Sequence, residues 1–165
     1  MSLFILKNIN SEGEAFCMYN ALSIARYIID FYNQHNRGIS NLKLQKVLYF
    51  VQAEFLVGTP DHRACFLDPI EAWDFGPVVP SVYHQYKIYG SGIIPSDNND
   101  ILKPYYDRIS EDDQEMINNI VEATFDYTAS ELVNLTHNQA PWKDAYRKGF
   151  NNEIPKQSIL NYFKE

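Results

Sequence analysis

SNLKLQKVLYFVQAEFLVG, residues 40–58, is the stretch that decides the fold. Its apolar residues recur every three or four positions, a spacing that places them along one side of a helix. They are Leu44, Val47, Leu48, Val51 and Phe55. Burying five such side chains is worth at most about 10 kcal/mol, which few other segments could match. We therefore predict a central helix against which the rest of the domain packs.

The two ends of this helix carry recognisable signals. Ser40 can accept a hydrogen bond from an unpaired N–H group of the first turn, and Gly58 is expected to provide a left-handed cap. The side opposite the apolar residues can form hydrogen bonds but contains no recognised catalytic set. It carries Gln45, Lys46, Tyr49 and Gln52.

Composition favours one acidic domain. The 165 residues are 45% apolar and 15% aromatic, and the net charge is −7. A strongly acidic chain is a poor binder of phosphate backbones, so nucleic acid is disfavoured and a basic protein partner fits better. Cys17 and Cys65 are too few for a disulfide framework, which predicts a reducing, cytoplasmic setting. No run of about 18 apolar residues or secretory signal is found, so we expect no membrane association.

The periodicity predicts a mainly α fold. We expect a single-domain helical bundle of about six to seven helices, with a small two-stranded β-hairpin inserted after the central helix. Residues 1–15 are assigned to an N-terminal lead-in segment and 16–165 to the domain. Besides the central helix, predicted helices cover 16–36, 79–89 and 142–148, and others begin at Ser110, Thr128 and Pro155. Gly38 is expected to end the first helix in a left-handed conformation.

The hairpin is expected to pair residues 64–67 with residues 70–75. Asp68 and Pro69 lie between these two short apolar runs. Because proline cannot adopt the positive φ that the tightest hairpin turns require, we predict a loose connection. Gly76 and Pro77 then form a sharp corner, and we assign both a structural role.

Two helix starts resemble capping boxes. Ser110 precedes three acidic residues, and Thr128 precedes Glu131 at the spacing that lets each side chain bond the backbone of the other. Acidic residues in a first turn also favour the positive end of the helix dipole. Both segments are therefore predicted to begin helices at these residues.

Metal and DNA sites are weakly supported. His62 and Cys65 have a spacing found among metal ligands, but no second ligand pair follows, so we predict no metal and no cofactor. The helix–turn–helix outline around residue 40 has a surplus of only two positive charges, from Arg37, Lys43 and Lys46 against Glu54. DNA binding is the minority interpretation.

His137 offers one possible catalytic group. Glu71, Asp74 or Asp144 could orient it for acid–base work, but nothing in the sequence brings them together. The favoured alternative is a histidine at a helix end, bonded to a backbone carbonyl. Glycine-rich phosphate loops and common hydrolase motifs are absent from the sequence.

Three separated pieces of the chain are similar to one family. They are ISNLKLQKVLYFVQ at 39–52, IEAWDFGPVVPSVY at 70–83 and LTHNQAPWKDAY at 135–146. In their order and spacing they resemble the Panacea domain, also called the SocA-like or phage-associated protein family. The resemblance extends from about Tyr19 to Phe163.

This resemblance implies an antitoxin of a toxin–antitoxin pair, often carried by a prophage or mobile element. Such a protein binds and neutralises a cognate toxin encoded beside it, and a host protease or chaperone is a possible further partner. The family's recurring positions here include Leu44 as well as nine residues assigned to sites. We predict partner binding by Gln45, Lys46, Tyr49, Trp73, Tyr83, His137 and Trp142, and structural roles for Gly76 and Pro77.

Two alternatives stay open at this point. One is a phage-encoded factor that binds a host defence protein, which needs the same kind of surface. The other is a small enzyme using His137 with a carboxylate. The sequence leaves the toxin and the oligomeric state undetermined.

Overall fold

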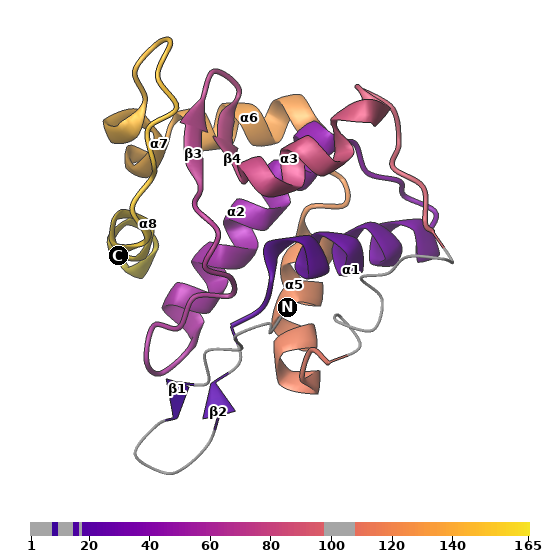
Figure 1. The fold of residues 1–165 in the computed structure, drawn as a ribbon, viewed down its shortest axis with the longest axis horizontal. Coiled ribbons are helices and arrows are strands. Elements are labelled where there is room, and N and C mark those ends of the chain that lie inside the picture. Colours follow the sequence, from indigo (N-terminus) through magenta and orange to yellow (C-terminus); the bar gives the residue numbers. More distant parts are fainter. Residues whose placement is uncertain (1–7, 10–14, 17, 98–107) are drawn as a thin grey trace, which may run out of the picture.

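A computed structural model describes residues 8–9, 15–16, 18–97 and 108–165, and these are mainly helical (Figure 1). The predicted helical bundle with a β-hairpin after the central helix is confirmed. The helices are α1 (Ala21–Gln34), α2 (Asn41–Gly58), α3 (Pro80–Tyr86), α5 (Glu111–Ala123), α6 (Ala129–His137), α7 (Ala140–Ala145) and α8 (Lys156–Lys164). The strands are β1 (Asn8–Ile9), β2 (Ala15–Phe16), β3 (Glu71–Trp73) and β4 (Gly76–Val78), and a short 3-10 helix, η1, covers Lys87–Tyr89.

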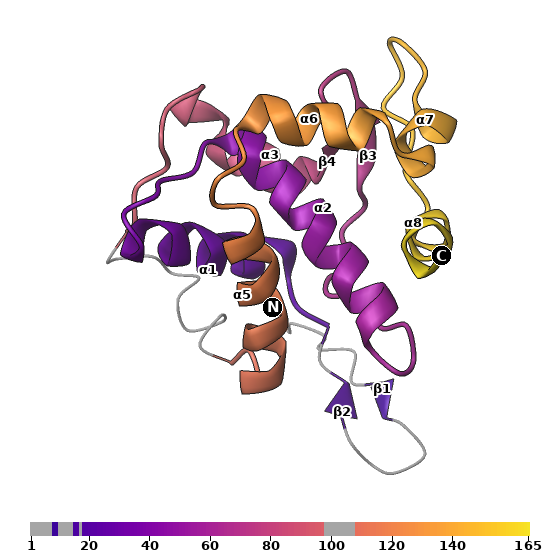
Figure 2. The ribbon, with the colours of Figure 1, turned by 180° about the vertical axis from the view of Figure 1, so that it is seen from behind.

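Helix α2 passes through the middle of the molecule. It contacts α1, α3, α5, α6, α8 and β4, and Figure 2 shows these elements around it. Thirteen of its eighteen residues are buried, including the four hydrogen-bonding residues opposite the apolar side. The polar residues are buried because they bond to distant segments. Gln52, for example, donates to the carbonyl oxygen of Phe66 and accepts from the N–H of Cys65, both at 2.8 Å.

The ends of α2 confirm one cap and correct the other. Ser40 accepts a hydrogen bond from the N–H of Lys43, as predicted. Gly58 is the last helical residue and lacks the positive φ expected of it. The helix ends at Thr59, whose hydroxyl donates to the carbonyl oxygen of Phe55 at 2.7 Å. A hydroxyl therefore closes the last turn in place of a left-handed glycine.

Helix α1 begins later than predicted. Asn20 is its cap, because the Asn20 side chain accepts from the N–H of Leu22 at 2.8 Å. Before the cap the chain is extended, and Tyr19 pairs with Phe66. Gly38 has the predicted positive φ, +63°. Most of the predicted lead-in, residues 1–7 and 10–14, lies outside the described part of the chain, and β1 pairs with β2 at its edge.

The hairpin pairs different strands from those expected. Strand β3 pairs with β4, with Glu71 opposite Val78, and only Phe66 of the run 64–67 forms a bridge. The turn falls between Trp73 and Gly76, so the predicted corner at Gly76 is the start of the second strand. Strand β3 also pairs with the segment around Glu153. The hairpin rests on α2 and α6, and β3 contacts α7 (Figure 1).

Helices α5, α6 and α8 begin after the predicted residues Ser110, Thr128 and Pro155, whereas α7 begins at Ala140, two residues before its predicted start. Ser110 accepts from the N–H of Asp113, and Thr128 forms the complete capping box with Glu131. Asp113 does not complete a second box, because its carboxylate binds Arg63 at 2.7 Å. Helix α7 ends at Ala145, three residues before its predicted end. Within the described residues no helix is both long enough and apolar enough to cross a bilayer.

Candidate partner-binding site

Helix α2 holds strand β4 through two buried polar side chains. Lys46 Nζ donates to the carbonyl oxygen of Pro77 at 2.8 Å, and Gln45 Oε1 accepts from the N–H of Val79 at 2.9 Å. Both side chains are almost completely removed from solvent. Burial lowers the pKa of Lys46 to about 7, because the charged amine loses its hydration. These two residues therefore fix the hairpin from inside the protein.

Helix α7 supports the hairpin turn from a second direction. The indole N–H of Trp142 donates to the carbonyl oxygen of Trp73 at 2.9 Å. Tyr146, directly after the helix, donates its hydroxyl to Asp74 at 2.8 Å. The Trp142 ring stacks on His137 and on Tyr146, with centroids 4.0 and 4.5 Å apart. A stack of three rings thus lies behind the turn.

His137 has a backbone partner where the enzyme hypothesis required a carboxylate. Its ring is hydrogen-bonded to the backbone of Asp74, while its Nε2 is buried without a hydrogen-bond partner among the described residues. Burial and the nearby Lys46 charge lower the pKa of His137. The Glu71 carboxylate accepts instead from the indole N–H of Trp73 at 2.7 Å. We call Gln45, Lys46, His137, Trp142 and Tyr146 the hairpin support.

Gly76 occupies a position where a side chain would not fit. Its φ is +97°, which disfavours every residue with a Cβ atom. An added Cβ would also lie 2.7 Å from Thr136 Oγ1 and 2.9 Å from Lys46 Cε. The absence of a side chain therefore lets β4 approach both α2 and α6.

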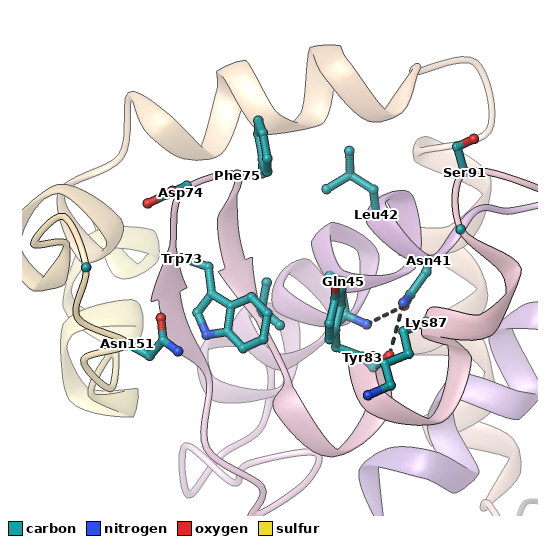
Figure 3. A pocket seen from close by; sticks show the side chains of 13 residues that line it. Asn41, Leu42, Gln45, Trp73, Asp74, Phe75, Tyr83, Lys87, Ser91 and Asn151 are labelled. Carbon is teal, nitrogen blue, oxygen red and sulfur yellow. Dashed lines mark hydrogen bonds between the residues drawn. The ribbon is translucent and has the colours of Figure 1, made fainter.

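A pocket of about 580 Å³ lies in front of the hairpin (Figure 3). The start of α2, the β3–β4 hairpin, the α3–η1 region and residues 149–151 border it. Its apolar walls include Trp73, Tyr83, Val78 and Leu42. Trp73 and Tyr83 meet edge to face with ring centroids 4.8 Å apart. This volume is in the range of about 300–1,000 Å³ found for ligand pockets.

Exposed aromatic side chains extend the pocket into a larger surface. Phe75, at the tip of the hairpin, lines the pocket and is 66% exposed. Phe150 is equally exposed and lies between Gly149 and Asn151, which both line the pocket. Exposed apolar groups gathered around a concave site are typical of protein interaction surfaces.

The residues predicted to bind a partner do not form one exposed groove. Trp73, Tyr83 and the edge of Gln45 line the pocket, whereas Lys46, His137 and Trp142 belong to the support behind it. Tyr49 is fully buried in α2 and donates to Gln139 at 2.9 Å. A direct partner contact by the residues outside the pocket lining stays a prediction.

Sequence reasoning missed several residues at this site. Phe75, Asn41 and Lys87 line the pocket but were not singled out. The available signal was Phe75 itself, a large apolar residue between Asp74 and Gly76, two residue types that favour turns. An apolar side chain at the tip of a turn is too far from the core to be buried there, so it is a candidate for contact with a partner.

The possible metal pair has other contacts. His62 Nδ1 bonds the carbonyl oxygen of Leu56 at 2.8 Å, and Cys65 is fully buried. Burial raises the pKa of the Cys65 thiol well above its usual range. Within 18–97 and 108–165, the structure shows no cluster of three or more His, Cys, Asp or Glu residues suited to a metal ion.

Comparison with known proteins identifies the family. The family described as "Antitoxin SocA-like, Panacea domain" matches residues 44–143, a range that includes most of α2, the hairpin and Trp142. The chain is also 34% identical over 132 residues to Antitoxin SocA of Caulobacter vibrioides (strain NA1000 / CB15N). That alignment covers 74% of this chain and 68% of the relative, and no solved structure matches significantly. The chain therefore belongs to the antitoxin SocA-like Panacea domain family and is antitoxin-like in function.

Proposed function

We propose that this chain neutralises a cognate toxin protein by binding it on the surface around the β3–β4 hairpin. Family membership supports an antitoxin role. The observation that supports this choice of surface is Phe75, which is 66% exposed on a turn whose backbone the hairpin support holds from behind. A large apolar side chain on a fixed turn can bury its area in a partner at little cost in conformational entropy.

The proposed mode of action is binding, without a chemical step. His137 lies outside the pocket lining, and the nearby Glu71 and Asp74 carboxylates accept hydrogen bonds from Trp73 and Tyr146. Neutralisation then follows from occupying the toxin surface. We assign this role to the domain formed by residues 16–165, acting in the cytoplasm where the toxin is made.

The toxin is proposed to be encoded near this chain's gene. A host protease or chaperone is a possible further partner, acting on the complex after it forms. Nucleic acid does not enter this proposal, because the would-be recognition helix α2 is buried along most of its length.

Co-expression tests the proposal. The neighbouring gene product is expressed alone, with this chain, and with an unrelated acidic helical protein as a control. We expect growth to stop with the neighbour alone and to resume only with this chain, and the two proteins to co-purify. A neighbour that is harmless alone, or that remains lethal beside this chain, would refute the proposed function for this protein.

A further inference from the structure

We propose that the pocket receives an extended segment of the toxin in which a large apolar side chain is flanked by one acidic and one basic residue. This specification rests on the proposed toxin binding, and it adds the chemistry of the segment that is recognised. It follows from three properties of the pocket: the state of its polar groups, its apolar walls and the charges at its sides.

The polar groups of the pocket floor are already bonded to one another. Gln45 Nε2 donates to Asn41 Oδ1 at 2.8 Å, and Asn41 Nδ2 donates to the carbonyl oxygen of Tyr83 at 3.1 Å. Gln45 Oε1 accepts from the N–H of Val79. A polar group entering the floor would compete with these bonds, so little affinity is gained from it.

The walls favour an apolar or aromatic side chain. Trp73 and Tyr83 present ring surfaces, and Leu42 and Val78 present aliphatic ones. Burial of an aromatic side chain against such walls is a common source of affinity in protein interfaces. The hairpin support fixes the position of Trp73 before binding, so no loop has to become ordered.

The sides of the pocket carry opposite charges. Lys87 lies on the η1 side, and its side-chain amine has no hydrogen bond or ion pair with any described residue. Asp74 lies on the hairpin side, where Oδ1 accepts from Tyr146 and Oδ2 accepts no hydrogen bond from the part of the chain that the structure describes. Figure 3 shows the two residues on different sides of the Trp73 ring. Charge complementarity therefore calls for an acidic residue facing Lys87 and a basic residue facing Asp74.

A protein segment suits this site better than a compact small molecule. Phe75 lines the pocket yet is 66% exposed, and the equally exposed Phe150 is not part of the lining, so only an occupant that continues over the rim would cover both rings. An extended segment does this while placing one side chain in the pocket.

A displayed library of random peptides tests this inference without the toxin. The purified chain is expected to select peptides with a large apolar residue between an acidic and a basic one. The Lys87→Glu variant should select peptides in which a basic residue takes the place of the acidic one. Asn151→Trp, which fills the pocket, should weaken the selected peptides by at least about tenfold, whereas Asn119→Trp on the exposed side of α5 should leave them unchanged.

The inference is overturned if the wild-type chain selects no peptide, or if Lys87→Glu selects peptides with the same charges as the wild type does. It is also overturned if Asn151→Trp and Asn119→Trp bind the selected peptides with equal affinity. Selection of peptides without an apolar residue would overturn it as well. Toxin rescue by the wild-type chain in the same strain shows whether the proposed function survives such a result. A chain that rescues but selects no such peptide retains its function and binds its toxin elsewhere.

Discussion

The Lys46 amine lies 2.8 Å from the carbonyl oxygen of Pro77, and this contact links the middle of the central helix to the hairpin that presents the candidate site. Lys46 is fully buried, and its pKa is lowered to about 7. Burial removes the water that would stabilise the charged amine, and the protein does not fully replace it. The same residue therefore supports the hairpin and makes the stability of the domain depend on pH.

The first prediction concerns that pH dependence. The unfolded chain keeps the Lys46 proton up to about pH 10.5, whereas the folded chain releases it near pH 7. Between these values the unfolded state binds more protons, so the free energy of unfolding rises with pH, by at most about 1.4 kcal/mol per unit. Urea unfolding at several values between about pH 7 and 9 measures the slope.

Lys46→Met should remove most of this slope, and the exposed Lys164→Met should keep it. Below pH 7 Lys46 is charged in the folded state, and its buried charge destabilises the fold. The free energy of unfolding of Lys46→Met should therefore exceed that of the wild type most at these pH values. Equal slopes in Lys46→Met and in the wild type would show that Lys46 does not titrate as described.

The second prediction concerns Gly76. Gly76→Ala should lower the free energy of unfolding by about 3 kcal/mol or more, because its Cβ would meet Thr136 and Lys46 on top of the strained φ. Gly149→Ala is the matched control. Gly149 has a similar φ of +82°, but no atom lies within 4 Å of the added Cβ. The free energy of unfolding should therefore fall by only about 1 kcal/mol. Equal losses, measured by chemical unfolding, would count against the close approach of β4 to α2.

The third prediction concerns Trp142. Trp142→Phe keeps an aromatic ring between His137 and Tyr146 but removes the N–H that bonds Trp73. We expect a loss of about 1 kcal/mol in unfolding free energy and weaker partner binding. Tyr127→Phe, at an exposed ring, should change stability by less than about 0.5 kcal/mol. A Trp142→Phe protein as stable as the wild type would mean that this hydrogen bond contributes nothing.

The fourth prediction separates binding from folding. Phe75→Ala should leave the melting temperature nearly unchanged, because the side chain is mostly in solvent, but should weaken toxin binding by about thirtyfold or more. Leu67→Ala removes a similarly exposed apolar side chain that does not line the pocket, and it should retain binding. Binding is measured by titration of the co-purified toxin, and equal affinity of the two variants would exclude Phe75 from the interface.

The sequence predicted the framework of the fold well where local signals are strong. Ser40, Ser110 and Thr128 begin helices as expected, since each cap depends on residues within one turn. The left-handed conformation of Gly38, after the first helix, was also predicted correctly. These features need no knowledge of distant parts of the chain.

The contacts of the buried polar residues could not be predicted in the same way. Lys46 bonds a carbonyl 31 residues away, and Gln45 an N–H 34 residues away. Periodicity showed that these residues lie opposite the apolar side of the helix and can form hydrogen bonds, but it does not identify their partners. Only the assembled hairpin shows that these residues face its backbone.

The strand pairing of the hairpin was predicted wrongly for a related reason. Gly76 and Pro77 were assigned to a corner because of the conformational freedom of glycine and the fixed φ of proline. In this hairpin the missing N–H of Pro77 costs no hydrogen bond between the strands. Ala72, the residue opposite Pro77, directs its own N–H away from β4 and donates it to the carbonyl oxygen of Asn152. The partner of a short strand depends on such contacts at both edges, which local patterns do not encode.

Hydrogen–deuterium exchange on the complex with the co-purified toxin tests the central claim most directly. Binding is predicted to slow exchange in residues 71–78, 87–91 and 149–151, with little change along α5. Protection confined to α5 and α1, or a complex that leaves the hairpin unchanged, would contradict the proposed binding surface.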